Sequence, residues 1–538
     1  MDRRDFIRIG MAGGAVAAAT GGEAMAATVG GGKKGGFSVV EASVADLQAA
    51  MASGKQSSVS ICKAYLARIK AIDKSGPRIN SIIELNPDAL SIAAALDKER
   101  KVKGPRGPLH GIPVLIKDNI ATADKMQTTA GSLALVGVKP PRDSFLVTKL
   151  RDAGAVILGK TNLSEWANLR STRSTSGWSG RGGQTRNPYA LDRDPSGSSA
   201  GSGASIAASL AAIAVGTETD GSIVSPSKAN GLVGIKPTVG LVSRNGVIPL
   251  SRTQDTAGPM ARCVADAAAL LTALAGSDAR DPATKDADAK KLDYMKSLDP
   301  DGLKGMRIGV VRANFGGRND LVAPLIDEAI KVMASKGAII VDPVEVPNIN
   351  KYGATELEVL LYEMKADMAA YLAEFAAGSS FKTLKDLIDF NEAHKDKELK
   401  FFGQEHFIRS EAKGGLDSKE YLDALANNMK YSREEGLDKA LKDNSLDCLL
   451  APSGQPTGLL DLINGSNGGG GGFSSPAAVA GYPHITVPAG YVYGLPIGLS
   501  LVGTAWSEGT LIKIAYAYEQ ATKHRQAPKY LKTLTPQG

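Results

Sequence analysis

Short runs of aliphatic and β-branched residues recur along the chain and alternate with helical patterns. The runs lie at residues 112–116, 155–158, 213–215, 306–311, 338–341, 448–450 and 495–502. Between them apolar residues recur at helical spacing, as in residues 321–334. Strands that alternate with helices are typical of an α/β fold, so the sequence predicts a large, mostly parallel or mixed β-sheet covered by helices.

The first predicted helix begins near Ser43. Residues 43–46, Ser-Val-Ala-Asp, resemble a capping box with Asp in place of the usual Glu, and apolar residues follow at helical spacing. A second helix is predicted over residues 59–72, with Cys62 on its apolar face. We therefore expect Cys62 to be a core residue.

The residues before these helices carry an export pattern. Twin arginines, Arg3 and Arg4, precede an apolar run at residues 9–20, and Ala-Met-Ala at 24–26 has the form of a cleavage site. The predicted segments are a twin-arginine signal peptide (1–26), a flexible glycine-rich lead-in (27–42) and a single domain (43–538).

This apolar run is too short and too rich in Gly and Ala to span a bilayer, which needs about 20 strongly apolar residues. We therefore expect the mature protein in the periplasm or secreted, without a stable membrane anchor. The twin-arginine translocation machinery, which exports folded proteins, is the partner that this pattern implies during export.

Composition is that of a globular protein with a substantial core, since the 538 residues are 43% hydrophobic and 22% charged. The net charge of +7 and the pI near 9.0 come from Lys and Arg that are interspersed with Asp and Glu, so we expect no nucleic-acid partner. Cys62, Cys263 and Cys448 lie far apart without a C-x-x-C pair. Their spacing favours neither a zinc site nor a disulfide framework and allows at most one bridge.

Residues 154–161 match the spelling of a phosphate-binding loop, G-x-x-x-x-G-K-[ST]. Such a loop needs a strand before it and a small, turn-forming interior whose N–H groups converge on the phosphates. Here the interior is itself the apolar run at 155–158, so we reject nucleotide binding at this segment.

Ser199 is a candidate nucleophile because residues 197–201 match G-x-S-x-G. A nucleophile of that type directly follows a buried strand, whereas residues 187–195 are polar and interrupted by proline. It also needs a histidine base, and chain order alone does not exclude the histidines downstream, which keeps Ser–His catalysis as an alternative. These are His394, His406, His484 and His524.

A longer set of motifs favours different chemistry. Ser-Gly-Ser-Ser-Ala-Gly-Ser at 196–202 is followed by Gly-Thr-Glu-Thr-Asp-Gly-Ser-Ile at 216–223 and by Gly-Leu-Val-Gly-Ile-Lys-Pro-Thr at 231–238. In this order the motifs resemble the amidase signature family. Further matching motifs lie at residues 108–119, 255–260, 480–483 and 494–498. The resemblance covers nearly all of the mature chain and implies the family's fold and hydrolysis of an amide, with no metal or organic cofactor.

The resemblance implies a Ser-Ser-Lys triad, with Ser222 as nucleophile, Ser198 as bridging serine and Lys117 as base. A serine hydroxyl needs a base to remove its proton, and lysine serves only when neutral. Half-neutrality near pH 7.4 requires the lysine pKa to fall about 3 units from about 10.4, which desolvation alone can supply. Lys117 ends an apolar run, and strand alternation turns Asp118 to the opposite face, where it would not hold the ammonium charged.

Protons should then pass from Ser222 to Ser198 to Lys117 and return along the same path to the leaving nitrogen. The resemblance also implies a cis peptide bond between Gly197 and Ser198. The turn that precedes the nucleophile should donate backbone N–H groups to the oxyanion of the tetrahedral intermediate. The expected donors are Thr219, Asp220, Gly221 and Ser222.

Three positions depart from the commoner family spelling. Glu218 replaces Asp, Asp220 replaces Gly and Val224 replaces Arg. Because the expected donors are backbone N–H groups, a different side chain at these positions does not remove them, and the expected oxyanion role is unaffected. The sequence leaves open whether the Asp220 carboxylate points away from the site or contacts substrate.

Within the family, the spelling of residues 216–223 and of 239–244 looks most like that of bacterial peptide amidases, which hydrolyse the C-terminal carboxamide of peptides to a free acid and ammonia. We therefore expect a peptide or other small amide as substrate. Aryl acylamide or other small-amide hydrolysis on the same triad is the nearest alternative. Residues 170–186 and 452–472 are expected to contact the substrate.

Two further alternatives differ in class. The amidase subunit of a tRNA-dependent glutamine amidotransferase resembles this family but needs cytoplasmic partners, and the export pattern disfavours it. An exported binding protein with an inactive amidase fold is disfavoured because Lys117, Ser198 and Ser222 are all present.

Overall fold

In the computed structural model, which describes residues 37–315, 320–466 and 472–535, eleven strands pair in one mixed sheet. Their order is β1-β3-β2-β6-β8-β7-β12-β13-β11-β9-β10. The strands are β1 (Ile82–Leu85), β2 (Pro113–Lys117), β3 (Val156–Thr161), β6 (Ile213–Glu218), β7 (Val233–Lys236), β8 (Thr256–Ala261), β9 (Arg307–Val310), β10 (Ile339–Val341), β11 (Cys448–Pro452), β12 (His484–Val492) and β13 (Leu495–Val502). The sheet confirms the predicted α/β class.

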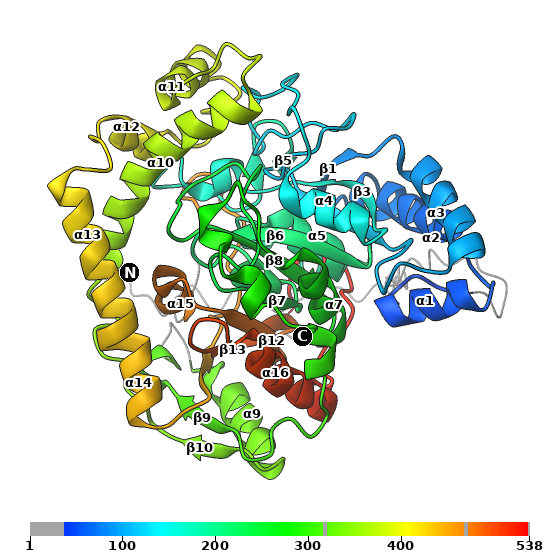
Figure 1. Ribbon diagram of the computed structural model, residues 1–538, viewed down its shortest axis with the longest axis vertical. Coiled ribbons are helices and arrows are strands. Elements are labelled where there is room, and N and C mark those ends of the chain that lie inside the picture. The colour runs from blue at the N-terminus through cyan, green and yellow to red at the C-terminus, as the bar shows by residue number, and fades with distance from the viewer. Residues whose placement is uncertain (1–36, 316–319, 467–471, 536–538) are drawn as a thin grey trace, which may run out of the picture. The chain divides into compact units, whose positions relative to one another are not determined.

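Parallel and antiparallel pairs occupy different parts of this sheet. β2 is parallel to both β3 and β6, and β9 is parallel to both β10 and β11. The remaining neighbours are antiparallel. β6, β8, β7 and β12 follow one another through the middle of the sheet (Figure 1). A separate hairpin pairs β4 (Trp178–Ser179) with β5 (Gly183–Gln184).

Every strand that the apolar runs predicted is present, as β2, β3, β6, β9, β10, β11 and β13. β2, β3 and β6 are buried at all positions, which explains their continuous apolar character. β3 contains six of the eight residues, 156–161, that spell a phosphate-binding loop, and its Lys160 donates to the Ile120 carbonyl oxygen at 2.6 Å. The segment is therefore a core strand, as its apolar interior predicted.

The described chain starts at Phe37, so the predicted signal peptide and residues 27–36 of the lead-in lie outside the described residues. α1 (Val44–Ala52) begins at the predicted capping box. The Ser43 hydroxyl accepts from the Asp46 N–H at 3.1 Å, and the Asp46 carboxylate accepts from the Ser43 N–H at 3.0 Å. Aspartate thus completes the box although its side chain is shorter than that of glutamate.

The second predicted helix is α2 (Ser58–Arg68), which continues into a π-helical turn at Ile69–Asp73. Cys62 on this helix is fully buried, which confirms it as a core residue, and all three cysteines are free thiols. The predicted helix at 321–334 is α9 (Ala323–Ser335).

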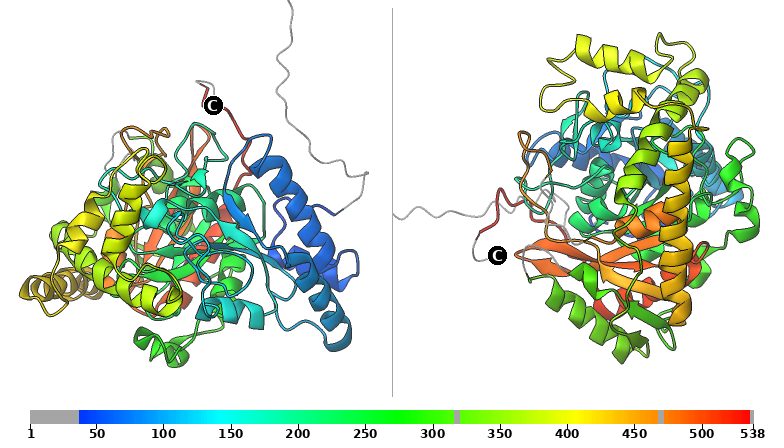
Figure 2. Two further views of the ribbon diagram at one scale, coloured as in Figure 1. Left: turned by 90° about the horizontal axis from the view of Figure 1, so that it is seen from above. Right: turned by 90° about the vertical axis from the view of Figure 1, so that its left-hand side faces the viewer.

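Other helices pack on the sheet or beside it. They are α3 (Ala89–Lys103), α4 (Phe145–Asp152), α5 (Ala200–Ala207), α6 (Val224–Ala229), α7 (Val264–Leu274), α8 (Ala287–Lys290), α10 (Gly353–Phe375), α11 (Leu384–Ala393), α12 (Glu405–Glu411), α13 (Lys419–Met429), α14 (Asp438–Asp443), α15 (Ser474–Ala480) and α16 (Glu508–Thr522). α5 packs on β2, β3 and β6, and α10 and α13 lie side by side (Figure 2). Among the described residues, no helix combines the length and apolarity that crossing a membrane requires.

Candidate active site

Lys117 and the turn that carries Ser222 lie at the same edge of the sheet. Lys117 ends β2, and the turn of residues 219–222 follows β6. β2 and β6 are parallel neighbours, with Ile116 opposite Val215. Because the carboxyl ends of parallel strands meet at one edge, the sheet brings the two segments together.

Lys117 is fully buried and its ammonium nitrogen contacts two residues. Nζ donates to Ser198 Oγ at 2.8 Å, to Thr217 Oγ1 at 2.8 Å and to the Thr217 carbonyl oxygen at 3.3 Å. The structure therefore joins two of the predicted site residues by a direct hydrogen bond. Thr217 was not predicted from the sequence, although its place on β6 beside β2 positions it to orient Lys117.

Burial lowers the pKa of Lys117 to about 7, while the negative charges of Asp255 and Glu218 act in the opposite direction. Asp118 has other partners, as strand alternation predicts. Its carboxylate accepts from the Gly131 N–H at 3.2 Å and pairs with Arg181 at 3.2 Å. Among the described residues, no carboxylate hydrogen-bonds to Lys117 Nζ, so burial prevails over the charges of Asp255 and Glu218.

The serine-rich loop before α5 presents Ser198 and Ser199 in different ways. The Gly197–Ser198 peptide bond is cis, as the family resemblance implied. Ser199 is fully buried, and its hydroxyl donates to the Thr217 carbonyl oxygen at 3.1 Å and accepts from the Thr217 N–H at 3.2 Å. No strand leads directly into Ser199, and none of the described histidines hydrogen-bonds to it, so its contacts favour a structural role.

Ser222 keeps a small exposed surface, with 8% of the residue accessible. Its carbonyl oxygen accepts from the Ser199 N–H at 3.2 Å, which links the two serine-bearing segments through their backbones. In the described part of the chain, Ser222 Oγ has no hydrogen-bond partner. The hydroxyl is therefore available to a substrate, and catalytic hydrogen bonds often tighten only when substrate is bound.

The turn of residues 219–222 leaves its N–H groups unused. Glu218 Oε2 accepts from the N–H groups of Ile223 at 2.7 Å and Val224 at 3.0 Å. Within the described residues, the N–H groups of the turn itself have no acceptor. Gly221 has a φ of 76°, and a side chain there would come within 3.0 Å of Ser225 Oγ, so glycine is required. The four N–H groups that were expected to be donors therefore remain free among the described residues.

The Asp220 side chain lies beside α15 and α10. Its carboxylate accepts from the Ser475 hydroxyl, and Glu356 of α10 is close enough to be affected by its charge. Burial and the neighbouring Asp220 raise the pKa of Glu356 to about 8. The Asp220 side chain is therefore engaged by residues of two helices.

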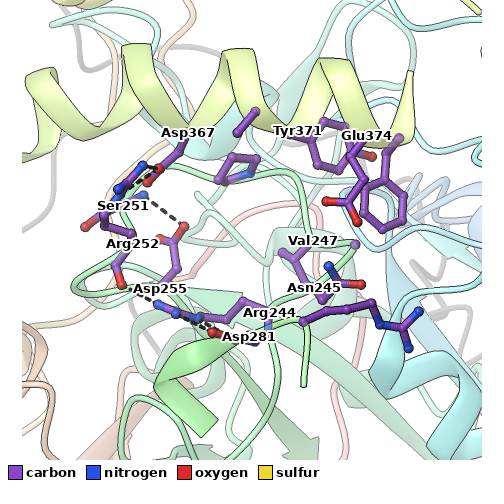
Figure 3. A pocket seen from close by; sticks show the side chains of 15 residues that line it. Arg244, Asn245, Val247, Ser251, Arg252, Asp255, Asp281, Asp367, Tyr371 and Glu374 are labelled. Atoms are coloured by element: carbon purple, nitrogen blue, oxygen red, sulfur yellow. Dashed lines mark hydrogen bonds and ion pairs between the residues drawn. The ribbon is translucent and has the colours of Figure 1, made fainter. Parts of the chain in front are cut away.

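A pocket lined by charged and apolar side chains contacts the turn through Asp255 (Figure 3). Asp255 forms part of its wall and accepts from Thr219 Oγ1 at 2.6 Å, which holds the turn. Arg244 pairs with Asp281 at 2.7 Å, and Arg252 pairs with Asp367. Two ion pairs therefore form part of the wall of this pocket.

Another cavity, of about 220 Å³, lies next to α6. Its walls come from Ser176, Asp194, Ser196, Ser225, Lys228, residues 453–458, Ser466 and Gly472. The two segments expected to contact substrate, 170–186 and 452–472, therefore meet beside the helix that follows Ser222. Arg170 itself is buried in an ion pair with Glu165 and does not line this cavity. In the part of the chain that the structure describes, no group of three or more His, Cys, Asp or Glu side chains could hold a metal ion.

The fold and these motifs define an amide hydrolase. The chain matches the family model named Amidase over residues 60–512 and belongs to the amidase signature family. It is 42% identical over 505 residues to a protein of Arabidopsis thaliana named "Probable amidase", covering 92% of this chain and 93% of the relative.

Among solved structures, the chain is similar to a peptide amidase. The native peptide amidase from Stenotrophomonas maltophilia is 51% identical, with a TM-score of 0.85, and the match covers 91% of this chain and 98% of that one. A structure of the peptide amidase PAM in complex with the competitive inhibitor chymostatin is also 51% identical, with a TM-score of 0.88, covering 91% and 100% of the two chains.

Proposed function

We propose that this amide hydrolase removes the C-terminal carboxamide of peptides, giving a free carboxylic acid and ammonia, through Lys117, Ser198 and Ser222. One observation carries the mechanism: a fully buried lysine nitrogen whose pKa is lowered to about 7 lies 2.8 Å from a serine hydroxyl. A lysine that is neutral for much of the time at pH 7 is a competent general base.

In the proposed acylation, the lone pair of neutral Lys117 takes the proton of Ser198 while Ser198 takes that of Ser222. Ser222 Oγ attacks the carboxamide carbon, and the resulting oxyanion accepts from the free N–H groups of residues 219–222. The proton returns through Ser198 to the leaving nitrogen, the C–N bond breaks and ammonia departs.

Deacylation repeats the relay with water as the nucleophile. Water loses a proton to the relay and attacks the ester carbon. Collapse of the second tetrahedral intermediate breaks the bond to Ser222 Oγ, which recovers its proton, and the carboxylic acid leaves.

The peptide assignment rests on the similarity to peptide amidases at 51% identity and on the cavity beside α6. Because ammonia is a small leaving group, a cavity of this size beside the helix that follows Ser222 is suited to the acyl part of the substrate. We also propose that the protein acts after twin-arginine export, on the basis of residues 1–26.

Ammonia release from peptide amides, amino-acid amides and anilides tests this function. We expect release from peptide amides by the wild type and loss of release in Ser222→Ala. Ser199→Ala is the matched control, because Ser199 lies in the adjacent loop but bonds only to Thr217 through its side chain. Turnover of anilides alone would refute the peptide assignment, whereas full activity of Ser222→Ala would refute the mechanism.

A fluorophosphonate probe tests the nucleophile independently. The adduct should map to Ser222 by peptide mass spectrometry. An adduct on Ser199 would restore the G-x-S-x-G interpretation of that loop.

A further inference from the structure

The cavity beside α6 contains a glutamine whose side-chain amide the protein does not use. Gln455 lines the cavity and is 3% exposed. Among the described residues, neither its Nε2 nor its Oε1 has a hydrogen-bond partner. Burying an amide with both ends unpaired is unfavourable, so this side chain retains the capacity to bind one donor and one acceptor.

The backbone around Gln455 is held firmly. Lys228 Nζ donates to the Gln455 carbonyl oxygen at 2.7 Å, and Thr457 Oγ1 donates to the Asp194 carbonyl oxygen at 2.6 Å. The Ser453 N–H donates to the Gly498 carbonyl oxygen at 2.8 Å. The loop is therefore fixed on both sides of Gln455. These backbone contacts, and not hydrogen bonds of the side chain, position the Gln455 side-chain amide.

The charged groups in the same cavity are already engaged. The Lys228 ammonium binds the Gln455 carbonyl oxygen, and the Asp194 carboxylate accepts from the Ser196 N–H at 2.6 Å and the Ser466 hydroxyl at 2.6 Å. What remains is a neutral amide in a cavity with serine hydroxyls. Such a cavity suits a neutral group that carries both an N–H and a carbonyl oxygen.

The cavity is lined by residues that lie two and three positions along the chain from the proposed catalytic serines. Ser225 in its wall is in the first turn after Ser222, and its N–H donates to the Gly221 carbonyl oxygen at 2.8 Å. Ser196, also in the wall, is two residues before Ser198. A substrate acylating Ser222 would therefore extend its acyl part along this wall.

We propose that the Gln455 amide recognises a peptide group in the acyl part of the substrate, with Oε1 accepting from its N–H and Nε2 donating to its carbonyl oxygen. Gln455 then selects for peptide amides over simple aliphatic or aryl amides. This inference rests on the proposed peptide amidase function and adds a residue that recognises the peptide group of the substrate.

Two substrates test the role of Gln455 directly. N-acetyl-leucinamide and 4-methylpentanamide share the reacting carboxamide and the isobutyl group, and only the first carries a peptide group. Gln455→Leu should lower kcat/KM for N-acetyl-leucinamide by about 25-fold, since two neutral hydrogen bonds are lost at about fivefold each. The value for 4-methylpentanamide should change by less than about twofold.

Gln404→Leu is the matched control. Gln404 is similarly buried, at 6% exposed, but its amide is satisfied, because its Oε1 accepts from Asn391 Nδ2 at 3.0 Å and its Nε2 donates to the Ile388 carbonyl oxygen at 3.2 Å. This control should lose thermal stability and keep the wild-type ratio of kcat/KM between the two substrates. Gln455→Leu should keep the wild-type thermal stability and change the ratio of kcat/KM between the two substrates.

The outcomes separate this inference from the proposed function. An unchanged substrate ratio in Gln455→Leu, or an equal loss on both substrates, would overturn the role of Gln455 while peptide amide turnover by the wild type stood. Absence of peptide amide turnover by the wild type would overturn the proposed function and this inference with it.

Discussion

Replacing Lys117 with methionine should abolish turnover and also change how stability depends on pH. Burial lowers the pKa of Lys117 from 10.5 to about 7. Between these values the folded protein holds the amine neutral, whereas the unfolded chain holds it protonated. Unfolding therefore takes up a proton, and the free energy of unfolding rises with pH by up to about 1.4 kcal/mol per unit.

Methionine at this position does not titrate. Between pH 7 and 9, the free energy of unfolding of the wild type should therefore rise by about 2 kcal/mol relative to that of Lys117→Met, after allowance for the half-protonated amine at pH 7. Other groups titrate in both proteins and cancel in this difference. Urea unfolding at pH 7, 8 and 9 measures it.

Ser198→Ala serves as the control, because it removes the proposed relay but keeps the buried amine. It should lose ammonia release while retaining the wild-type pH slope of stability. If the difference in free energy of unfolding between wild type and Lys117→Met stayed constant from pH 7 to 9, Lys117 would not titrate near pH 7. That result would refute its proposed role as general base.

Three further results are expected. In Gly221→Ala, the φ of 76° becomes unfavourable for alanine and the oxyanion donors shift, so kcat should fall about 100-fold with a change of only a few degrees in Tm. In the wild type, kcat/KM should decline above about pH 8, where Glu356 loses its proton and a negative charge appears beside Asp220 and the turn of residues 219–222, and Glu356→Gln should keep its rate to higher pH. Iodoacetamide at pH 8 should leave Cys62 and Cys448 unmodified in the native protein and alkylate both in urea, as read by mass spectrometry, because both thiols are buried and burial raises their pKa, that of Cys62 to about 12.

The strands that the sequence predicts are those rich in aliphatic and β-branched residues, although Pro113 interrupts β2 and Gly309 interrupts β9. β7, β8 and β12 lie in the middle of the sheet and were not predicted, because their aliphatic residues are scattered among glycine, proline and polar residues. Pro259 in β8 lies opposite Val215 of β6 and beyond the pairing of β8 with β7, which covers only Ala261 and Met260. Proline in a central strand argues against a strand when the sequence alone is considered.

The motifs fixed the identity of the candidate site better than its surroundings. Lys117 and Ser198 were expected together and are hydrogen-bonded. Thr217 and Glu356 were not predicted, because each depends on a partner more than 80 residues away. Gln455 lies in the segment 452–472 that was expected to contact substrate, but its individual role was not predicted, because the cavity wall is formed by several loops. Spacing along the chain carries no signal for contacts of that kind.

The strand order has a consequence for how the enzyme becomes functional. β9, β10 and β11 join the other strands only through the hairpin of β12 and β13, which is synthesised last. The proposed catalytic residues belong to the block made first, while the Gln455 wall of the cavity follows β11 in the other block. At about 5–20 residues per second, translation separates the two by many seconds. The nascent chain would therefore contain the proposed catalytic residues before it contains the wall proposed to recognise the substrate. The hairpin of β12 and β13 then joins the two blocks of strands.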